Sequence, residues 1–120
     1  MRKSSPLFAT TLCLALVCAG AVSSASAQTL SPAAEGRRAW LKYNCYGCHG
    51  MRAQGGMGPN IAHEADDVGE AVMSGEEGGM PSFRRIVTST DIANLRAYLR
   101  SIGTTSEPKF THWWEPVPTK

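Results

Sequence analysis

Two cysteines and a histidine lie within five residues, in the stretch Cys45-Tyr46-Gly47-Cys48-His49. Two thiols at this spacing can each add to one vinyl group of a porphyrin, and the histidine directly after them can bind the porphyrin iron. C-x-x-C-H is the attachment pattern of a c-type haem. The motif therefore predicts one covalently bound haem c, with Cys45 and Cys48 as attachment residues and His49 as an axial ligand.

Two other kinds of site use closely spaced cysteines. A C-x-x-C pair can form a disulfide or a thioredoxin-like redox centre, but His49 follows directly here and no βαβ pattern surrounds the motif. A zinc site would need a second C-x-x-C or H-x-H half, which the sequence lacks. A thiol–disulfide oxidoreductase therefore remains the less favoured alternative.

A haem that only transfers electrons needs a second axial ligand, and a methionine thioether favours a high reduction potential. Met80 is the strongest candidate, because it lies in the stretch Gly78-Gly79-Met80-Pro81. The glycines let the backbone come close to a haem, and the proline stiffens the loop. We therefore predict that Met80 binds the iron opposite His49.

Three other methionines and two histidines compete with Met80: Met51, Met57, Met73, His63 and His112. Met51 is too close to His49 along the chain to reach the opposite haem face, and Met73 is assigned to core packing. Bis-histidine ligation would lower the potential. If no side chain filled the sixth position, the protein would instead be a haem enzyme or a gas-binding haem protein.

A second loop, Gly58-Pro59-Asn60, is a candidate support for the histidine ligand. The rigid carbonyl of Pro59 can accept a hydrogen bond from His49 Nδ1, which would fix the ring and raise its basicity. A tight turn without this role is the alternative.

The first 27 residues have the pattern of a cleaved secretory signal peptide. Arg2 and Lys3 precede a short apolar stretch, and Ala25-Ser26-Ala27 offers a cleavage site. Cleavage would remove Cys13 and Cys18, leaving only the two motif cysteines. We therefore expect a periplasmic protein that is not inserted in the membrane; an uncleaved N-terminal anchor is the alternative.

Charge excludes one class of partner. Loss of Arg2 and Lys3 from twelve basic residues leaves ten, against ten acidic residues, so nothing indicates nucleic-acid binding. The charges are unevenly placed, however. An acidic window holds Glu64, Asp66, Asp67, Glu70, Glu76 and Glu77, and later arginines are Arg84, Arg85, Arg96 and Arg100. They form either solvated surface or a steering patch for a redox partner.

Helical patterns recur between glycine-rich loops, and no period-2 strand is present. Three helices are predicted: one capped by Ser31 with Pro32 in its first turn and running to about Tyr43, a short one over Ala65–Met73, and one capped by Thr88 with Asp91 and ended by Gly103. The sequence thus predicts an all-α domain over residues 28–103, with three or so helices wrapped around the haem. Residues 104–120 form a tail rich in proline and aromatic residues, which we expect to pack on the domain in extended form.

The chain resembles the class I c-type cytochromes of bacterial periplasms. The matching features lie between about Ala33 and Ile102, and they are Gly36, Trp40, the C-Y-G-C-H site, Gly58-Pro59, Gly79-Met80-Pro81, Leu95, Tyr98 and Leu99. The resemblance implies that the first and last helices pack together, with Gly36 against the Tyr98 region. It also implies His49/Met80 ligation, one exposed haem edge, and a one-electron carrier that is not an enzyme.

The tail adds a second, shorter resemblance. Trp113-Trp114-Glu115-Pro116 is similar to the ends of small cytochromes that accept electrons from alcohol dehydrogenases dependent on pyrroloquinoline quinone. The resemblance implies a periplasmic dehydrogenase as donor, with another cytochrome or a terminal oxidase as acceptor. We expect the carrier to be a monomer.

Overall fold

The structure is a computed structural model that describes residues 29–109. The predicted signal peptide lies outside the described residues. The same holds for the tail from Phe110 onward, which includes His112, Trp113 and Trp114.

The described residues contain four helices and no strand, which confirms the all-α prediction. The helices are α1 (Pro32–Lys42), α2 (Cys45–His49), α3 (Val68–Ser74) and α4 (Ser89–Ser101). The predicted helices correspond to α1, α3 and α4, although α3 begins three residues later than expected. The haem motif itself forms α2, a short helix that the sequence did not predict.

Side-chain caps begin the two long helices. The Ser31 hydroxyl accepts a hydrogen bond from the Ala34 amide at 3.2 Å, and Pro32 occupies the first turn of α1. At α4, Thr88 Oγ1 accepts from the Asp91 amide at 3.1 Å, while the Asp91 carboxylate accepts from the Thr88 amide at 3.0 Å. This reciprocal capping box satisfies two amides that the helix cannot pair internally. Both predicted helix starts are confirmed.

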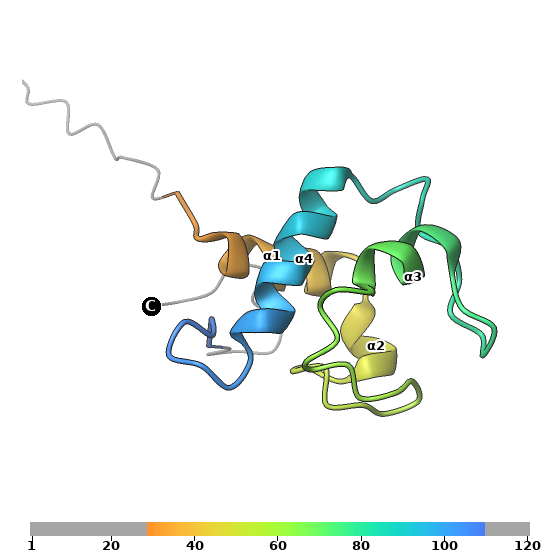
Figure 1. Ribbon diagram of the computed structural model, residues 1–120, viewed down its shortest axis with the longest axis horizontal. Helices are drawn as coiled ribbons and strands as arrows, with labels where there is room; N and C mark the ends of the chain where they lie inside the picture. Colours follow the sequence, from red (N-terminus) through yellow and green to blue (C-terminus); the bar gives the residue numbers. More distant parts are fainter. Residues whose placement is uncertain (1–28, 110–120) are drawn as a thin grey trace, which may run out of the picture.

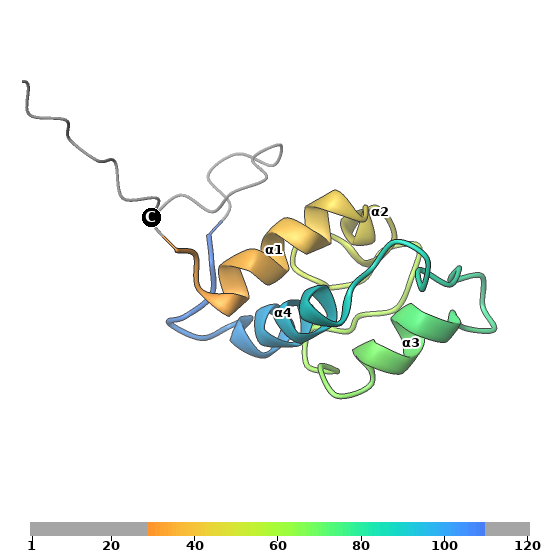
Figure 2. The ribbon, with the colours of Figure 1, turned by 90° about the horizontal axis from the view of Figure 1, so that it is seen from above.

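Helices α1 and α4 cross in close contact (Figures 1 and 2). A Cβ atom at Gly36 would overlap the carbonyl oxygen of Asn94 and lie 2.7 Å from Tyr98 Cβ. The residue must therefore be glycine, because the α4 backbone occupies the space that any side chain would need. This contact is the one implied by the resemblance of Gly36 and Tyr98 to the cytochrome pattern.

The largest side chains of the core come from α1 and α4, the two crossing helices. The largest fully buried ones are Trp40, Arg37, Tyr98, Leu95 and Leu99. The rings of Trp40 and Tyr98 lie 5.8 Å apart at an interplanar angle of 58°, a favourable tilted packing. Helix α3 covers α4 from a second side with the buried Val68 and Val72. Among residues 29–109, none of the helices combines the length and hydropathy that a membrane span requires.

We predict that Gly36→Ala lowers the free energy of unfolding by about 1–3 kcal/mol, the usual cost of forcing extra volume into a packed contact. Alanine has a higher helix propensity than glycine and would by itself stabilise α1. A lower free energy of unfolding therefore indicates that α4 lies in close contact with position 36. Chemical denaturation followed by circular dichroism measures it. Gly78→Ala is the matched control, because nothing lies within 4 Å of a Cβ at that position. A stabilised Gly36→Ala variant would contradict the contact.

The capping box predicts a pH dependence. Partial burial alone would raise the pKa of Asp91, but hydrogen bonds from the Thr88 amide, the Thr88 hydroxyl and the Tyr43 hydroxyl outweigh burial and lower it from 3.8. A depressed pKa in the folded state stabilises the protein above the unfolded value, and this stability is lost as pH falls. Below pH 3.8 the wild type should therefore lose stability more steeply than Asp91→Asn, measured by thermal unfolding over a pH series. Asp67→Asn, at a helix start without a side-chain cap, should behave as the wild type.

Candidate haem-binding site

The motif residues occupy one turn of helix directly after α1. Asn44 adopts the left-handed conformation, with φ of 58°, and so ends α1 and redirects the chain into α2. Cys45 is half-buried and packs against the core, whereas Cys48 is exposed. Residues three apart on a helix share a face, so both thiols are presented on the same side. Burial raises the pKa of Cys45 to about 11, which keeps this thiol protonated at neutral pH.

Residues 50–60, here called the collar, wrap around His49. The Gly55 amide donates to the His49 carbonyl at 2.8 Å, and the Gly58 amide donates to the Cys48 carbonyl at 2.8 Å. His49 Nδ1 lies 2.9 Å from the carbonyl oxygen of Pro59. Because a carbonyl can only accept, Nδ1 must carry the proton, and Nε2 keeps its lone pair for a metal. The hydrogen bond anticipated from the Gly58-Pro59 stretch is thus present.

The imidazole ring of His49 is held on two sides and is only 8% exposed. On one side, a Cβ atom at Gly58 would lie 3.0 Å from His49 Cε1 and 3.1 Å from Nδ1. Glycine at position 58 therefore lets the collar backbone lie against the ring. On the other side, the Trp40 ring is centred 6.1 Å from the imidazole. Together with the Pro59 hydrogen bond, these contacts fix the orientation of the ring.

The collar is attached to the rest of the molecule at three consecutive residues. Trp40 Nε1 in α1 donates to the Gly50 carbonyl at 3.1 Å, and the Tyr98 hydroxyl in α4 donates to the Met51 carbonyl at 3.0 Å. Burial raises the pKa of Tyr98 well above its usual range, so the hydroxyl stays a donor. The third attachment joins Arg52 to Glu107. Apart from the presence of two large aromatic residues in the predicted helices, no sequence pattern indicates these partners.

The second predicted ligand, Met80, lies in a tightly closed loop, residues 75–83, here called the Met80 loop. Gly75 ends α3 with φ of 78°, and a Cβ there would lie 2.6 Å from the Met80 carbonyl oxygen. The Glu76 amide donates to that same carbonyl at 3.0 Å. The Met80 side chain is half-buried and packs against the core.

Three hydrogen bonds attach the Met80 loop and the residue after it to α3. The Phe83 amide donates to the Val72 carbonyl at 2.8 Å, and Ser82 Oγ and Arg84 Nε donate to the Met73 carbonyl at 2.6 and 3.2 Å. These bonds satisfy carbonyls that the end of a helix leaves free. Figures 1 and 2 both place α2 and the loop after α3 at the same end of the molecule.

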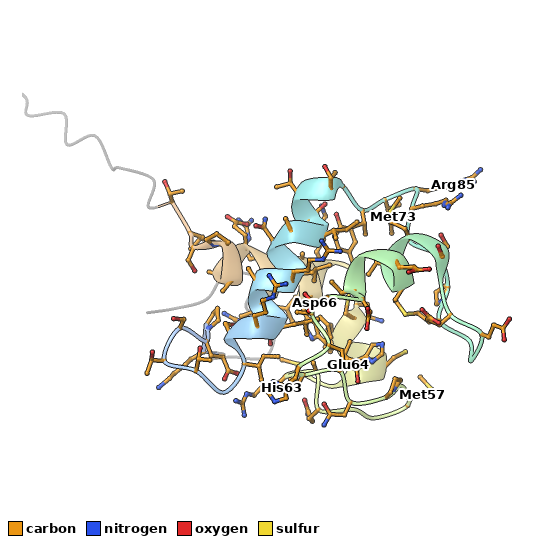
Figure 3. The ribbon with its side chains drawn as sticks, viewed as in Figure 1. Met57, His63, Glu64, Asp66, Met73 and Arg85 are labelled. Atoms are coloured by element: carbon orange, nitrogen blue, oxygen red, sulfur yellow. The ribbon has the colours of Figure 1, made fainter. Side chains whose placement is uncertain are left out.

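The competing ligand candidates occupy less suitable positions. Met57 is 85% exposed at the outer edge of the collar (Figure 3), and His63 is also exposed. Met51 is half-buried within the collar beside His49. Met73 was assigned to core packing, but it is half-buried and lies outside the core cluster. The reason is helical phase: Val68 and Val72 are four positions apart and form the buried face of α3, whereas Met73 follows Val72 by one position and lies on another side.

The residues present fit haem c. A protonated Nδ1 leaves the other nitrogen of His49 as the metal ligand, two free thiols lie on the same short helix, and half-buried apolar side chains pack against the core. The half-buried group consists of Cys45, Tyr46, Ile61, Met80, Phe83 and Ile92. Within residues 29–109, no group of three or more His, Cys, Asp or Glu side chains could hold a metal ion by itself. The helical fold of this part of the chain also lacks the βαβ unit of a thioredoxin-like centre.

The acidic window and the arginines are partly paired with each other. Arg100 in α4 forms an ion pair with Asp66, and Arg96 Nη2 donates to the Asp66 carbonyl at 3.3 Å. The five other carboxylates of this window are exposed near α3 and the Met80 loop: Glu64, Asp67, Glu70, Glu76 and Glu77. The fold therefore neutralises part of the charge in the acidic window by pairing it with the later arginines.

Comparisons with known proteins agree with this site. A family model described as cytochrome c oxidase, cbb3-type, subunit III matches residues 31–99. Among solved structures, cytochrome cL from the marine methylotrophic bacterium Methylophaga aminisulfidivorans is similar, with 25% sequence identity and a TM-score of 0.50. The similarity covers 62% of this chain but only 55% of that one, so the chain spans about half the length of its structural neighbour. No curated protein gives a significant match.

The family match covers more than half of the chain and includes α1, the haem motif, the collar, the Met80 loop and most of α4. The protein therefore belongs to this family of c-type cytochrome domains, and it is an all-α protein with covalently bound haem c.

Proposed function

We propose that the protein is a periplasmic one-electron carrier that takes electrons from a dehydrogenase and passes them to another cytochrome or a terminal oxidase. In this proposal Cys45 and Cys48 anchor the haem, and His49 and Met80 are the axial ligands. The observation that carries the proposal is the fixed His49 ring, whose Nδ1 is bonded to the Pro59 carbonyl so that Nε2 is free for iron.

The surrounding residues suit electron transfer better than substrate chemistry. Bound haem c supplies an iron that alternates between ferric and ferrous states. The collar holds the His49 ring, and hydrogen bonds to α3 hold the Met80 loop. Ligands fixed in this way would move little between oxidation states, and Met80 bound to the iron would keep other molecules away from it. The protein orients the iron ligands and excludes other molecules from the iron. Electron transfer needs no acid–base step.

The location and the partner are proposed from sequence features. The first 27 residues support export, and the short similarity of the Trp113-Trp114 stretch supports a quinoprotein alcohol dehydrogenase as donor. The likeness to cytochrome cL of a methylotrophic bacterium is compatible with that choice. We propose a domain over residues 28–103 and a tail over residues 104–120 that packs on it. The buried Pro108 and the Arg52–Glu107 pair support this for the described part of the tail.

We predict that Met80→Leu removes the sixth ligand. The ferric protein should lose its low-spin spectrum and its methionine–iron charge-transfer band, and should bind cyanide and carbon monoxide. The midpoint potential should fall by on the order of 0.1 V, because axial ligands set haem potentials. Met57→Leu is the matched control and should leave the spectrum unchanged, since Met57 is 85% exposed. A wild-type protein that already binds cyanide readily would instead support an open-site haem enzyme or gas-binding protein.

The donor is tested by stopped-flow reduction with purified quinoprotein alcohol dehydrogenases. If the exposed carboxylates of the Met80 loop guide docking, the double variant Glu76→Gln/Glu77→Gln should slow the bimolecular rate by about two- to tenfold at low salt. The difference should disappear at high ionic strength. Glu35→Gln, on α1, serves as the control and should react as the wild type. Equal rates for all three proteins at every salt concentration would rule out docking through these carboxylates.

A further inference from the structure

The collar has one attachment that the haem motif does not explain. Gly50 is held by Trp40 from α1, and Met51 is held by Tyr98 from α4. The next residue, Arg52, is held by Glu107, which lies beyond the end of α4 and 55 residues away in sequence. Three consecutive residues after His49 are thus attached to three different parts of the fold.

The Arg52–Glu107 pair has a geometry that few surface ion pairs have. Arg52 Nε lies 2.5 Å from Glu107 Oε1, and Arg52 Nη2 lies 2.7 Å from Oε2. Glu107 Oε2 also accepts from the Gly103 amide at 2.7 Å, and the Glu107 side chain is only 12% exposed. Exposed ion pairs usually contribute little, but a bidentate pair with a shielded carboxylate is an exception. The hydrogen bonds from Arg52 lower the pKa of Glu107, so the pair is ionised at neutral pH.

The collar needs such a restraint, because its backbone is strained next to Arg52. Ala53 is fully buried and adopts φ of 57°, a left-handed conformation that is costly for any residue with a side chain. The Ala53 amide donates to the Gly50 carbonyl at 3.2 Å, and the Ala53 carbonyl accepts from the Ile61 amide at 2.9 Å. A strained residue of this kind persists only where its surroundings fix it. Arg52 is the adjacent residue, and its side chain is the part of the collar that Glu107 holds.

We propose that Arg52 and Glu107 form a latch that positions His49. By fixing the collar, the latch keeps the Gly55 amide on the His49 carbonyl and the Pro59 carbonyl on His49 Nδ1. Arg52 and Glu107 are therefore positioning residues for the iron ligand, and the segment after α4 contributes to the haem site without touching it. The inference rests on the proposed ligation by His49.

Position and charge make different predictions for the two single variants: charge alone shifts their potentials in opposite directions, whereas a loosened collar shifts both in the same direction. A charge effect alone would lower the midpoint potential in Arg52→Gln, which loses a cation, and raise it in Glu107→Gln, which loses an anion. A loosened collar would weaken the His49–Pro59 hydrogen bond in both variants and make the histidine a poorer electron donor. We therefore expect both potentials to shift upward, and we expect the charge-swapped Arg52→Glu/Glu107→Arg protein to return toward the wild-type value.

Hydrogen exchange of the haem-loaded full-length protein gives a second readout that does not depend on electron transfer. In both single variants, the Gly55 and Gly58 amides should exchange about three- to fivefold faster, because they bond to His49 and Cys48. The Leu99 amide in α4 should keep its rate. Glu35→Gln breaks another exposed arginine–glutamate pair, Arg38–Glu35, and should change neither the potential nor the collar amides.

Two outcomes would overturn the latch. One is a pair of opposite potential shifts with unchanged collar amides, which would leave only a charge effect. The other is faster exchange at all amides, Leu99 included, which would mean that the pair merely stabilises the fold. A wild-type spectrum without a histidine-ligated low-spin haem is a separate result. It would overturn the proposed function together with this inference, whereas the first two outcomes overturn the inference alone.

Discussion

The close crossing of α1 and α4 at Gly36 is the constraint on which the rest of the structure depends. Because no side chain separates the backbones there, Trp40 and Tyr98 pack against each other one turn further along. Both side chains are buried, yet a polar atom of each one donates a hydrogen bond to a carbonyl of the collar. The position of the histidine is therefore set by a contact between two helices that contain none of the motif residues.

Local patterns made most of the fold predictable. The caps at Ser31 and Thr88 and the helix-breaking glycines identified three of the four helices, because these signals depend on neighbouring residues. The ligands were indicated by residue type and spacing in the C-x-x-C-H and Gly-Met-Pro stretches. The ligation itself remains a prediction, whereas the binding of haem c follows from family membership as well.

The parts that sequence reasoning missed are those fixed by distant residues. Arg37 is fully buried in α1, although a charged residue in a helix ordinarily indicates a solvated face. Met73 lies outside the core because the buried face of α3 is formed by Val68 and Val72. No pattern within ten residues of Glu107 indicates that it meets Arg52, since pairing across 55 positions is a property of the folded chain alone.

The collar and the residues that hold it lie far apart in the sequence, and this separation has a consequence for how the site forms. Covalent attachment involves only a five-residue stretch, whereas the collar is completed by Tyr98 and Glu107, near the end of the described chain. Contacts of such long sequence separation form late in folding. The motif residues can therefore form their helical turn in a chain whose last helix has not yet docked. Formation of the site is thus divided into a local part, the spacing of the two thiols and His49, and a long-range part, the orientation of the His49 ring by residues far along the chain.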